Sequence, residues 1–121
     1  MPYLLLIREH GMRDRWSDAE ARQAHEKMMG FANALKARGL CAAAESLRPD
    51  TEGVRVEVRG GKRIVVEGPF AESREMVGGF FLLTCESQKE ALAVASECPA
   101  VEWATVEVRE VAPCWPHRRP A

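Results

Sequence analysis

The stretch GFFLLTCESQKEALAVASECP, residues 79–99, decides the fold because it contains a complete strand-to-helix unit. Residues 79–85 form a short apolar run, which predicts a strand. Ser87 and Glu90 have the spacing of a capping box, in which a hydroxyl and a carboxylate satisfy free backbone amides at a helix start. Apolar residues then recur at helical spacing as far as Cys98, and Pro99 helps to end the helix.

The same kind of unit opens the chain. Residues 3–7 (YLLLI) form a short apolar run, which predicts a strand covered on both faces or at the centre of a sheet. Ser17 and Glu20 repeat the capping-box spacing and predict a helix to about Arg38, with Gly39 as a left-handed stop. One face of this helix should pack on the sheet, through Ala21, Ala24, Met28, Phe31, Ala32 and Leu35.

A hairpin is predicted over residues 54–66, where valines alternate with charged residues on both sides of a glycine pair. We expect a three-residue loop, because it places the apolar side chains of both strands opposite one another, with Val56 facing Val66. The same register sets Arg55 opposite Glu67 on the other face.

Two further strands complete the prediction, over residues 40–47 and over residues 103–111 (WATVEVREV). The resulting order of strand, helix, strand, hairpin, strand, helix and strand predicts an α+β fold of ferredoxin-like split β-α-β type with an inserted hairpin. We expect one domain over residues 1–111 and a proline-rich C-terminal tail over residues 112–121. Helices on one side leave the other face of the sheet to be covered, so we expect a homodimer.

Composition argues against several classes of protein. The formal net charge is -1, from 17 basic and 18 acidic residues with no basic stripe, so direct nucleic-acid binding is not expected. The apolar start is too short for a membrane span or a signal peptide. The four cysteines are scattered without metal-ligand spacing, which favours reduced thiols in a cytoplasmic protein that holds no metal and no cofactor.

Residues 67–75 (EGPFAESRE), together with residues 78–81 (GGFF), resemble the DGPF subgroup of the YCII-related family, whose name motif is Asp-Gly-Pro-Phe. The resemblance runs from the first strand to residues 106–109 and so covers nearly the whole domain. It implies a ferredoxin-like fold that commonly dimerises in an α/β-barrel arrangement. Related YCII proteins resemble enzymes with a His and a carboxylate in a cleft, and one branch resembles dehydrochlorinases of chlorinated hydroquinones. DGPF members also occur beside or fused to extracytoplasmic-function sigma factors, which implies a sigma factor as a candidate partner.

Two positions depart from the family pattern. Glu67 stands where the motif has Asp, which keeps the charge and lengthens the side chain by one methylene. Cys98 precedes Pro99 where many relatives have Asp-Pro, so the role of that Asp does not transfer to this chain.

Candidate catalytic residues follow from the resemblance and from titration chemistry. His25 aligns with the family's histidine on the first helix, and His is the side chain whose ordinary pKa lies nearest to neutral pH. We therefore consider His25 a candidate proton shuttle, with Glu67 or Glu72 fixing its tautomer. The structural alternatives are a solvated histidine on the helix surface, a solvated turn around Glu72, and an ion pair between Glu67 and Arg55.

Candidate ligand-binding residues lie at two places. Phe70 either walls a pocket or plugs the edge of the core, and the sequence leaves both open. Arg8 and His10, just past the first strand, could hold an anionic small molecule at the sheet end; ordinary loop polarity is the alternative.

Two functions of different kinds remain. The first is a small cofactor-independent enzyme of lyase or isomerase type acting on a small cyclic or aromatic compound. The second is a module that binds a small ligand or docks on a transcription partner such as a sigma factor.

Overall fold

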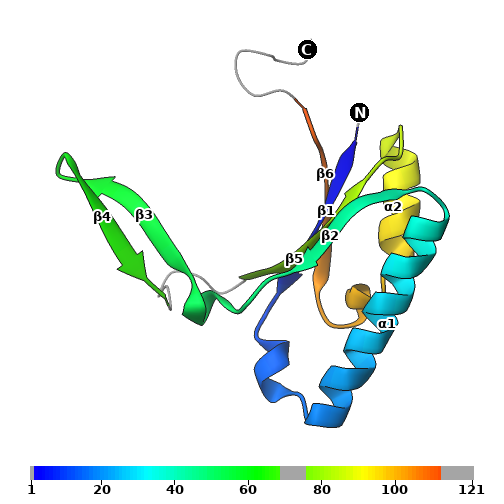
Figure 1. Ribbon diagram of the computed structural model, residues 1–121, viewed down its shortest axis with the longest axis horizontal. Coiled ribbons are helices and arrows are strands. Elements are labelled where there is room, and N and C mark those ends of the chain that lie inside the picture. Colours follow the sequence, from blue (N-terminus) through cyan, green and yellow to red (C-terminus); the bar gives the residue numbers. More distant parts are fainter. Residues whose placement is uncertain (1, 69–75, 113–121) are drawn as a thin grey trace.

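The computed structural model describes residues 2–68 and 76–112 (Figure 1). Its elements follow the predicted order: β1 (Tyr3–Glu9), α1 (Asp18–Ala37), β2 (Cys41–Ser46), β3 (Val54–Arg59), β4 (Lys62–Glu67), β5 (Met76–Leu83), α2 (Gln88–Glu97) and β6 (Thr105–Glu110). Three short 3-10 turns connect them: η1 (Met12–Arg15), η2 (Asp50–Glu52) and η3 (Pro99–Glu102).

Four strands form an antiparallel sheet in the order β2-β5-β1-β6, while β3 and β4 pair only with one another among the described residues. Both helices cover the same face of the four-stranded sheet (Figure 1). This is the ferredoxin-like α+β arrangement that the order of elements predicted, with the hairpin inserted between β2 and β5.

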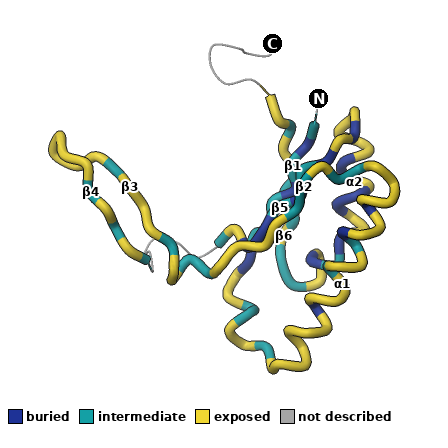
Figure 2. Tube along the Cα trace, in the orientation of Figure 1, coloured by how far each residue is buried: buried dark blue, intermediate teal, exposed yellow. Residues whose placement is uncertain are grey.

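The core lies between this sheet and the helices (Figure 2). β1 runs through the centre of the sheet, and its alternate residues are buried toward the helices, which confirms the prediction of a central strand. The largest fully buried side chains come from both sheet and helix: Leu5, Leu35, Leu83 and Cys98.

α1 begins and ends as predicted. The Ser17 hydroxyl accepts a hydrogen bond from the Glu20 amide at 3.1 Å, and the Glu20 carboxylate accepts one from the Ser17 amide at 3.2 Å. Gly39 follows the helix with φ of 71°, a left-handed conformation that glycine adopts without steric cost.

α2 shows only half of the predicted capping box. The Ser87 hydroxyl accepts from the Glu90 amide at 3.1 Å. The Glu90 carboxylate accepts instead from the amide of Glu86, one residue before the cap, at 3.4 Å. The helix start is therefore still closed by side chains, although the reciprocal bond is shifted by one residue.

The predicted register of the hairpin is wrong. Val54, not Arg55, lies opposite Glu67, and Arg55 lies opposite Val66, so the loop is the two-residue pair Gly60-Gly61. Both loop glycines have positive φ, 56° and 78°, as tight hairpin turns that match the strand twist require. The apolar face of the hairpin is exposed, so no buried surface forces the valines of the two strands into the expected alignment.

The cysteines in the described residues are free, and two of them lie in the core. Cys85 is 2% exposed and Cys98 is 0% exposed. Burial raises the pKa of both thiols, and the nearby Glu90 carboxylate adds to the effect at Cys85. Cys41 is half-buried.

A thiol titration should separate these cysteines. In a Cys114→Ser variant, which leaves only cysteines of known environment, we expect Cys41 to react with a disulfide reagent at pH 8 while Cys85 and Cys98 react only on unfolding. Folding raises the pKa of both buried thiols, so the thiols ionise more readily in the unfolded chain. Their contribution to the free energy of unfolding should therefore be complete below about pH 8.5 and should decrease as the pH rises further. If all three thiols of the native protein reacted with the reagent at the same rate, the predicted protection of the two buried cysteines would be wrong.

Candidate functional site

A cavity of about 440 Å³ lies between α1 and the helix-covered face of the sheet. Much of its wall is apolar, with contributions from Ile7, Trp16, Ala24, Met28, Phe81 and Trp103. Its polar lining comes from Glu9, Arg13, His25, Lys36, Glu45 and Ser46. A volume of this order suits a small organic molecule.

The cavity follows from the side chains along α1. In the first half of the helix the residues that face the sheet include Ala21 and Ala24, which are too small to fill the space beneath them. In the second half the larger Leu35 is 1% exposed, and Phe31 meets Phe81 edge to face at a ring distance of 5.3 Å. The helix therefore contacts the sheet through Phe31 and Leu35, while its alanines leave room for a cavity that extends along the helix as far as Lys36.

Glu9 is the buried polar residue of the cavity. It is 3% exposed, because the alternation of β1 turns it toward the helices with Tyr3, Leu5 and Ile7. Its Oε2 lies 2.7 Å from Nε of Arg13, four residues further along the chain, and the two groups form an ion pair. The pair is not aligned as a hydrogen bond, so Oε2 has no hydrogen-bond partner among the described residues.

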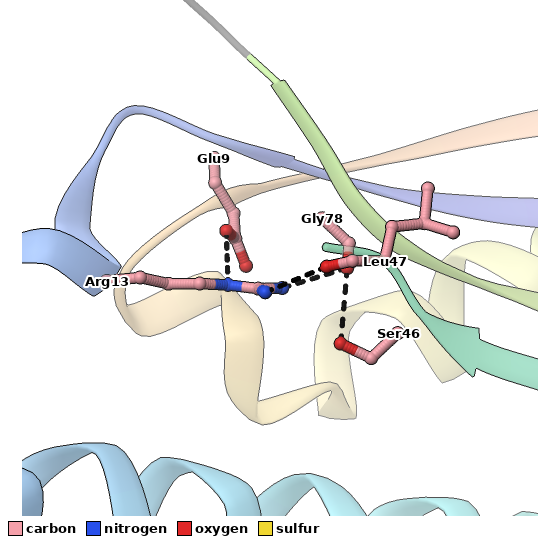
Figure 3. Close-up of polar contacts among 5 residues, drawn as sticks. All are labelled: Glu9, Arg13, Ser46, Leu47 and Gly78. Carbon is pink, nitrogen blue, oxygen red and sulfur yellow. Dashed lines mark hydrogen bonds and ion pairs between the residues drawn. The ribbon is translucent and has the colours of Figure 1, made fainter. Parts of the chain in front are cut away.

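Arg13 holds this carboxylate in place and also binds two backbone carbonyls (Figure 3). Its Nη1 donates to the carbonyl of Leu47 at 3.0 Å, and its Nη2 donates to the carbonyl of Gly78 at 2.8 Å. The Ser46 hydroxyl also donates to the Gly78 carbonyl, at 3.4 Å. Arg13 thus ties η1 to the ends of β2 and β5 while it neutralises Glu9.

Gly78 makes the close approach of these groups possible. The register between β1 and β5 shifts by one residue between Ile7 and Arg8, which inserts Gly78 as an extra residue beside the ion pair. A Cβ at this position would lie 2.7 Å from Nη2 of Arg13 and closer still to the Glu9 carboxylate. No side chain fits there without displacing the pair.

Two tryptophans join the segments at one side of the cavity. Trp16 follows η1, and Trp103 follows η3. Their rings meet edge to face with centroids 5.3 Å apart. This contact connects the loop before α1 to the loop before β6 and adds aromatic surface to the cavity wall.

His25 is an exposed residue of α1 that lines this cavity, so the structure brings it to the same hollow as a carboxylate, Glu9. Glu67 lies at the end of β4 in the hairpin and is absent from the cavity lining. The catalytic roles of both residues stay predictions. Glu72 and Phe70 fall outside the described residues.

The other predicted ligand residues lie elsewhere. Arg8 points to the face of the sheet that the helices do not cover, where its Nη1 pairs with Glu107 at 3.6 Å. His10 is exposed just after β1. Neither residue lines the cavity. Across residues 2–68 and 76–112 no group of His, Cys, Asp and Glu could hold a metal, and no helix is long and apolar enough to cross a membrane.

The sequence reasoning missed Glu9, Arg13 and Trp16. The sequence does contain a signal for Glu9 and Arg13. Glu9 continues the alternation of Tyr3, Leu5 and Ile7, so a strand extended by two residues places this carboxylate on the buried face. A buried carboxylate needs a cation, and Arg13 follows it four residues later. For Trp16 we find no comparable signal.

The fold agrees with what comparison finds. The YCII-related domain matches residues 1–114, and the chain therefore belongs to this family. An uncharacterized protein of Rhizobium meliloti is 28% identical over 94 residues, which cover 78% of this chain and 76% of that protein. Placement in the DGPF subgroup stays a prediction.

A solved structure with the same fold is 5-chloro-2-hydroxyhydroquinone dehydrochlorinase of Burkholderia phenoliruptrix AC1100, in complex with 2,5-dihydroxybenzoquinone. It matches with a TM-score of 0.50 and 14% identity, over 93% of this chain and 94% of that one. The likeness supports the ferredoxin-like fold.

Gly78→Ala should lower the free energy of unfolding by about 1–3 kcal/mol, because the added methyl overlaps the Glu9–Arg13 pair. Gly30→Ala is the matched control. A Cβ on Gly30 meets nothing within 4 Å in the middle of α1, so this change should raise stability by about 0.5–1 kcal/mol. Urea unfolding followed by circular dichroism measures both, and equal effects would contradict the close approach at Gly78.

Proposed function

We propose that this protein is a small cofactor-independent enzyme of lyase or isomerase type that acts on a small cyclic or aromatic compound in the α1 cavity. One observation carries the proposal: an imidazole, that of His25, and a buried carboxylate, that of Glu9, line a single hollow with an otherwise largely apolar wall. A largely apolar pocket with a few polar groups is the usual form of a small-molecule site.

Glu9 suits the task of orienting a substrate. A charged carboxylate at 3% exposure is tolerated because Arg13 neutralises it. Among the described residues its Oε2 has no hydrogen-bond donor, and a hydroxyl or amine group of a ligand would supply one. Since the guanidinium of Arg13 is engaged by two carbonyls, we assign it the role of positioning Glu9.

His25 suits the task of moving a proton. Its position on the rim of the cavity leaves the imidazole open to solvent, so it can exchange protons with water between turnovers. In an isomerisation it would take a proton from one atom of the substrate and return it to another. In an elimination it would take the proton while the leaving group departs with the bonding electrons.

The wall of the cavity favours a ring-shaped substrate. Trp16, Phe81 and Trp103 offer aromatic surface, and Met28 adds a deformable apolar contact. The dehydrochlorinase of the same fold acts, by its name, on a chlorinated hydroxyhydroquinone. Hydroxylated rings are therefore the compounds to test first, because their hydroxyl groups also provide donors for Glu9.

The test uses 2,5-dihydroxybenzoquinone and a panel of chlorinated hydroquinones, with binding followed by calorimetry and turnover by chromatography of the products. We expect His25→Ala to reduce turnover by about 10²–10⁴-fold with little change in binding. Glu9→Gln should weaken binding by about ten-fold or more, because a hydrogen bond to a charged acceptor is lost.

Gln23→Ala serves as the control, since Gln23 is exposed on α1 and does not line the cavity. Circular dichroism separates lost function from lost folding in Glu9→Gln, and Glu9→Asp provides a second variant that keeps the charge. Turnover that is unaffected by His25→Ala would overturn the assigned mechanism.

The alternative function, a binding or regulatory module, is favoured by the exposed valines of the hairpin, which form an apolar surface with no partner element in the described residues. Binding of ring compounds without any turnover would support this alternative. A sigma factor as the partner stays a prediction.

A further inference from the structure

The carboxylates that border the α1 cavity do not offset all of its positive charge. Glu9 and Arg13 neutralise one another at 2.7 Å. Glu45 lies opposite Phe80 in the register of β2 and β5, and Phe80 lies opposite Leu6 in the register of β5 and β1. Residues directly opposite one another share a face of a sheet, so the side chain of Glu45 lies on the face that the helices do not cover. Its carboxylate is therefore directed away from the cavity that β2 borders.

Lys36 carries the positive charge that remains. It lines the cavity from the last turn of α1 and is exposed. Within residues 2–68 and 76–112 its side chain forms no ion pair and no hydrogen bond. The ammonium of Lys36 therefore gives the cavity one positive charge that no ion pair within these residues neutralises.

The direction of α1 separates Lys36 from the buried carboxylate. The helix runs back along the sheet after β1, so its last turn lies away from Glu9 at the end of that strand (Figure 1). One stripe of α1 lines the cavity, and its members recur at helical spacing: His25, Met29, Ala32 and Lys36. The helix rises about 16 Å from His25 to Lys36. Because side chains on a helix lean toward its N-terminus, the Lys36 ammonium reaches back along this stripe toward His25.

The cavity therefore has a hydrogen-bond acceptor at Glu9 and a free cation at Lys36, with apolar and aromatic surface between them. Apolar surroundings lower the local dielectric constant, which strengthens the attraction between an ammonium and an anion. Arg13 is less suited to bind an anionic ligand, because its guanidinium already pairs with Glu9 and binds two carbonyls. A matching ligand has a hydroxyl on one side of a ring and a negative charge on the other.

We propose that Lys36 determines specificity by binding a carboxylate of the substrate, and that the substrates are hydroxylated ring acids whose hydroxyl donates to Glu9. This inference rests on the proposed function, which places a ring compound in the α1 cavity, and it adds the charge of that compound. Lys36 also lies where the dipole of α1 favours a cation. That role affects the stability of the helix, whereas the proposed role affects the choice between a charged and an uncharged ligand.

The test compares para-hydroxybenzoate with para-hydroxybenzamide, which has nearly the same shape and the same ring hydroxyl but no charge. Calorimetry on the full chain at low salt should give a dissociation constant about ten-fold lower for the acid, because the acid gains a charge-assisted hydrogen bond. Lys36→Met keeps the apolar stem of the side chain and should abolish this preference by weakening the binding of the acid alone. Lys36→Arg keeps the charge and should retain most of the preference.

Lys27→Met is the matched control. Lys27 belongs to the same helix, its side chain is 54% exposed and pairs with Glu102 at 3.3 Å, and it does not line the cavity. The control removes one positive charge from the chain, as Lys36→Met does, so it separates a contact in the cavity from an effect of net charge. The preference for the acid should be unchanged in Lys27→Met. In the wild type, added salt should reduce the preference, because it screens the ammonium and leaves the amide unaffected.

Failure of this inference differs from failure of the proposed function. Equal affinities of the wild type for acid and amide, a preference that survives Lys36→Met, or an equal loss in Lys27→Met would overturn the role of Lys36 and leave the cavity as a ring-compound site. If neither compound bound, both proposals would be wrong. Circular dichroism and thermal melting verify that the variants are folded, and Lys36→Gln, a second uncharged variant, should show the same loss of preference as Lys36→Met.

Discussion

The buried ion pair between Glu9 and Arg13 is the constraint on which the geometry of the cavity depends. A carboxylate at 3% exposure is stable only with a cation beside it, and that cation comes from the loop directly after β1. Because the same guanidinium also binds the carbonyls of Leu47 and Gly78, three segments distant in sequence are fixed at one point. These contacts therefore hold together the end of the sheet that lines the cavity.

The rest of the site depends on the sizes of individual side chains. The alanines of α1 that line the cavity leave space beside the ion pair, while Phe31 and Leu35 pack in the core against the sheet. Gly78 allows the backbone of β5 to approach the pair closely. The cavity is thus a consequence of small residues at specific positions on a helix and a strand whose other positions are packed in the usual way.

The fold could be predicted because its signals are local and repeated. Capping residues marked both helix starts, short apolar runs identified β1 and β5, and alternation identified β6. The hairpin register failed because it was argued from a buried face, whereas the valines are exposed and the turn geometry of Gly60-Gly61 decides the pairing. The candidate site was found only in part. His25 carried a family signal, but Glu9 lies just beyond the predicted end of its strand, and its burial depends on tertiary contacts.

The charged residues of the hairpin formed by β3 and β4 have a consequence for newly made chains. Among the described residues these two strands pair only with one another, and unpaired strand edges invite pairing with any other extended chain. Around the valines, the strands carry an excess of positive charge, including Arg59, Lys62 and Arg63 near the tip. Like charges on two hairpins repel, so these residues act as gatekeepers that discourage edge-to-edge aggregation of newly made chains.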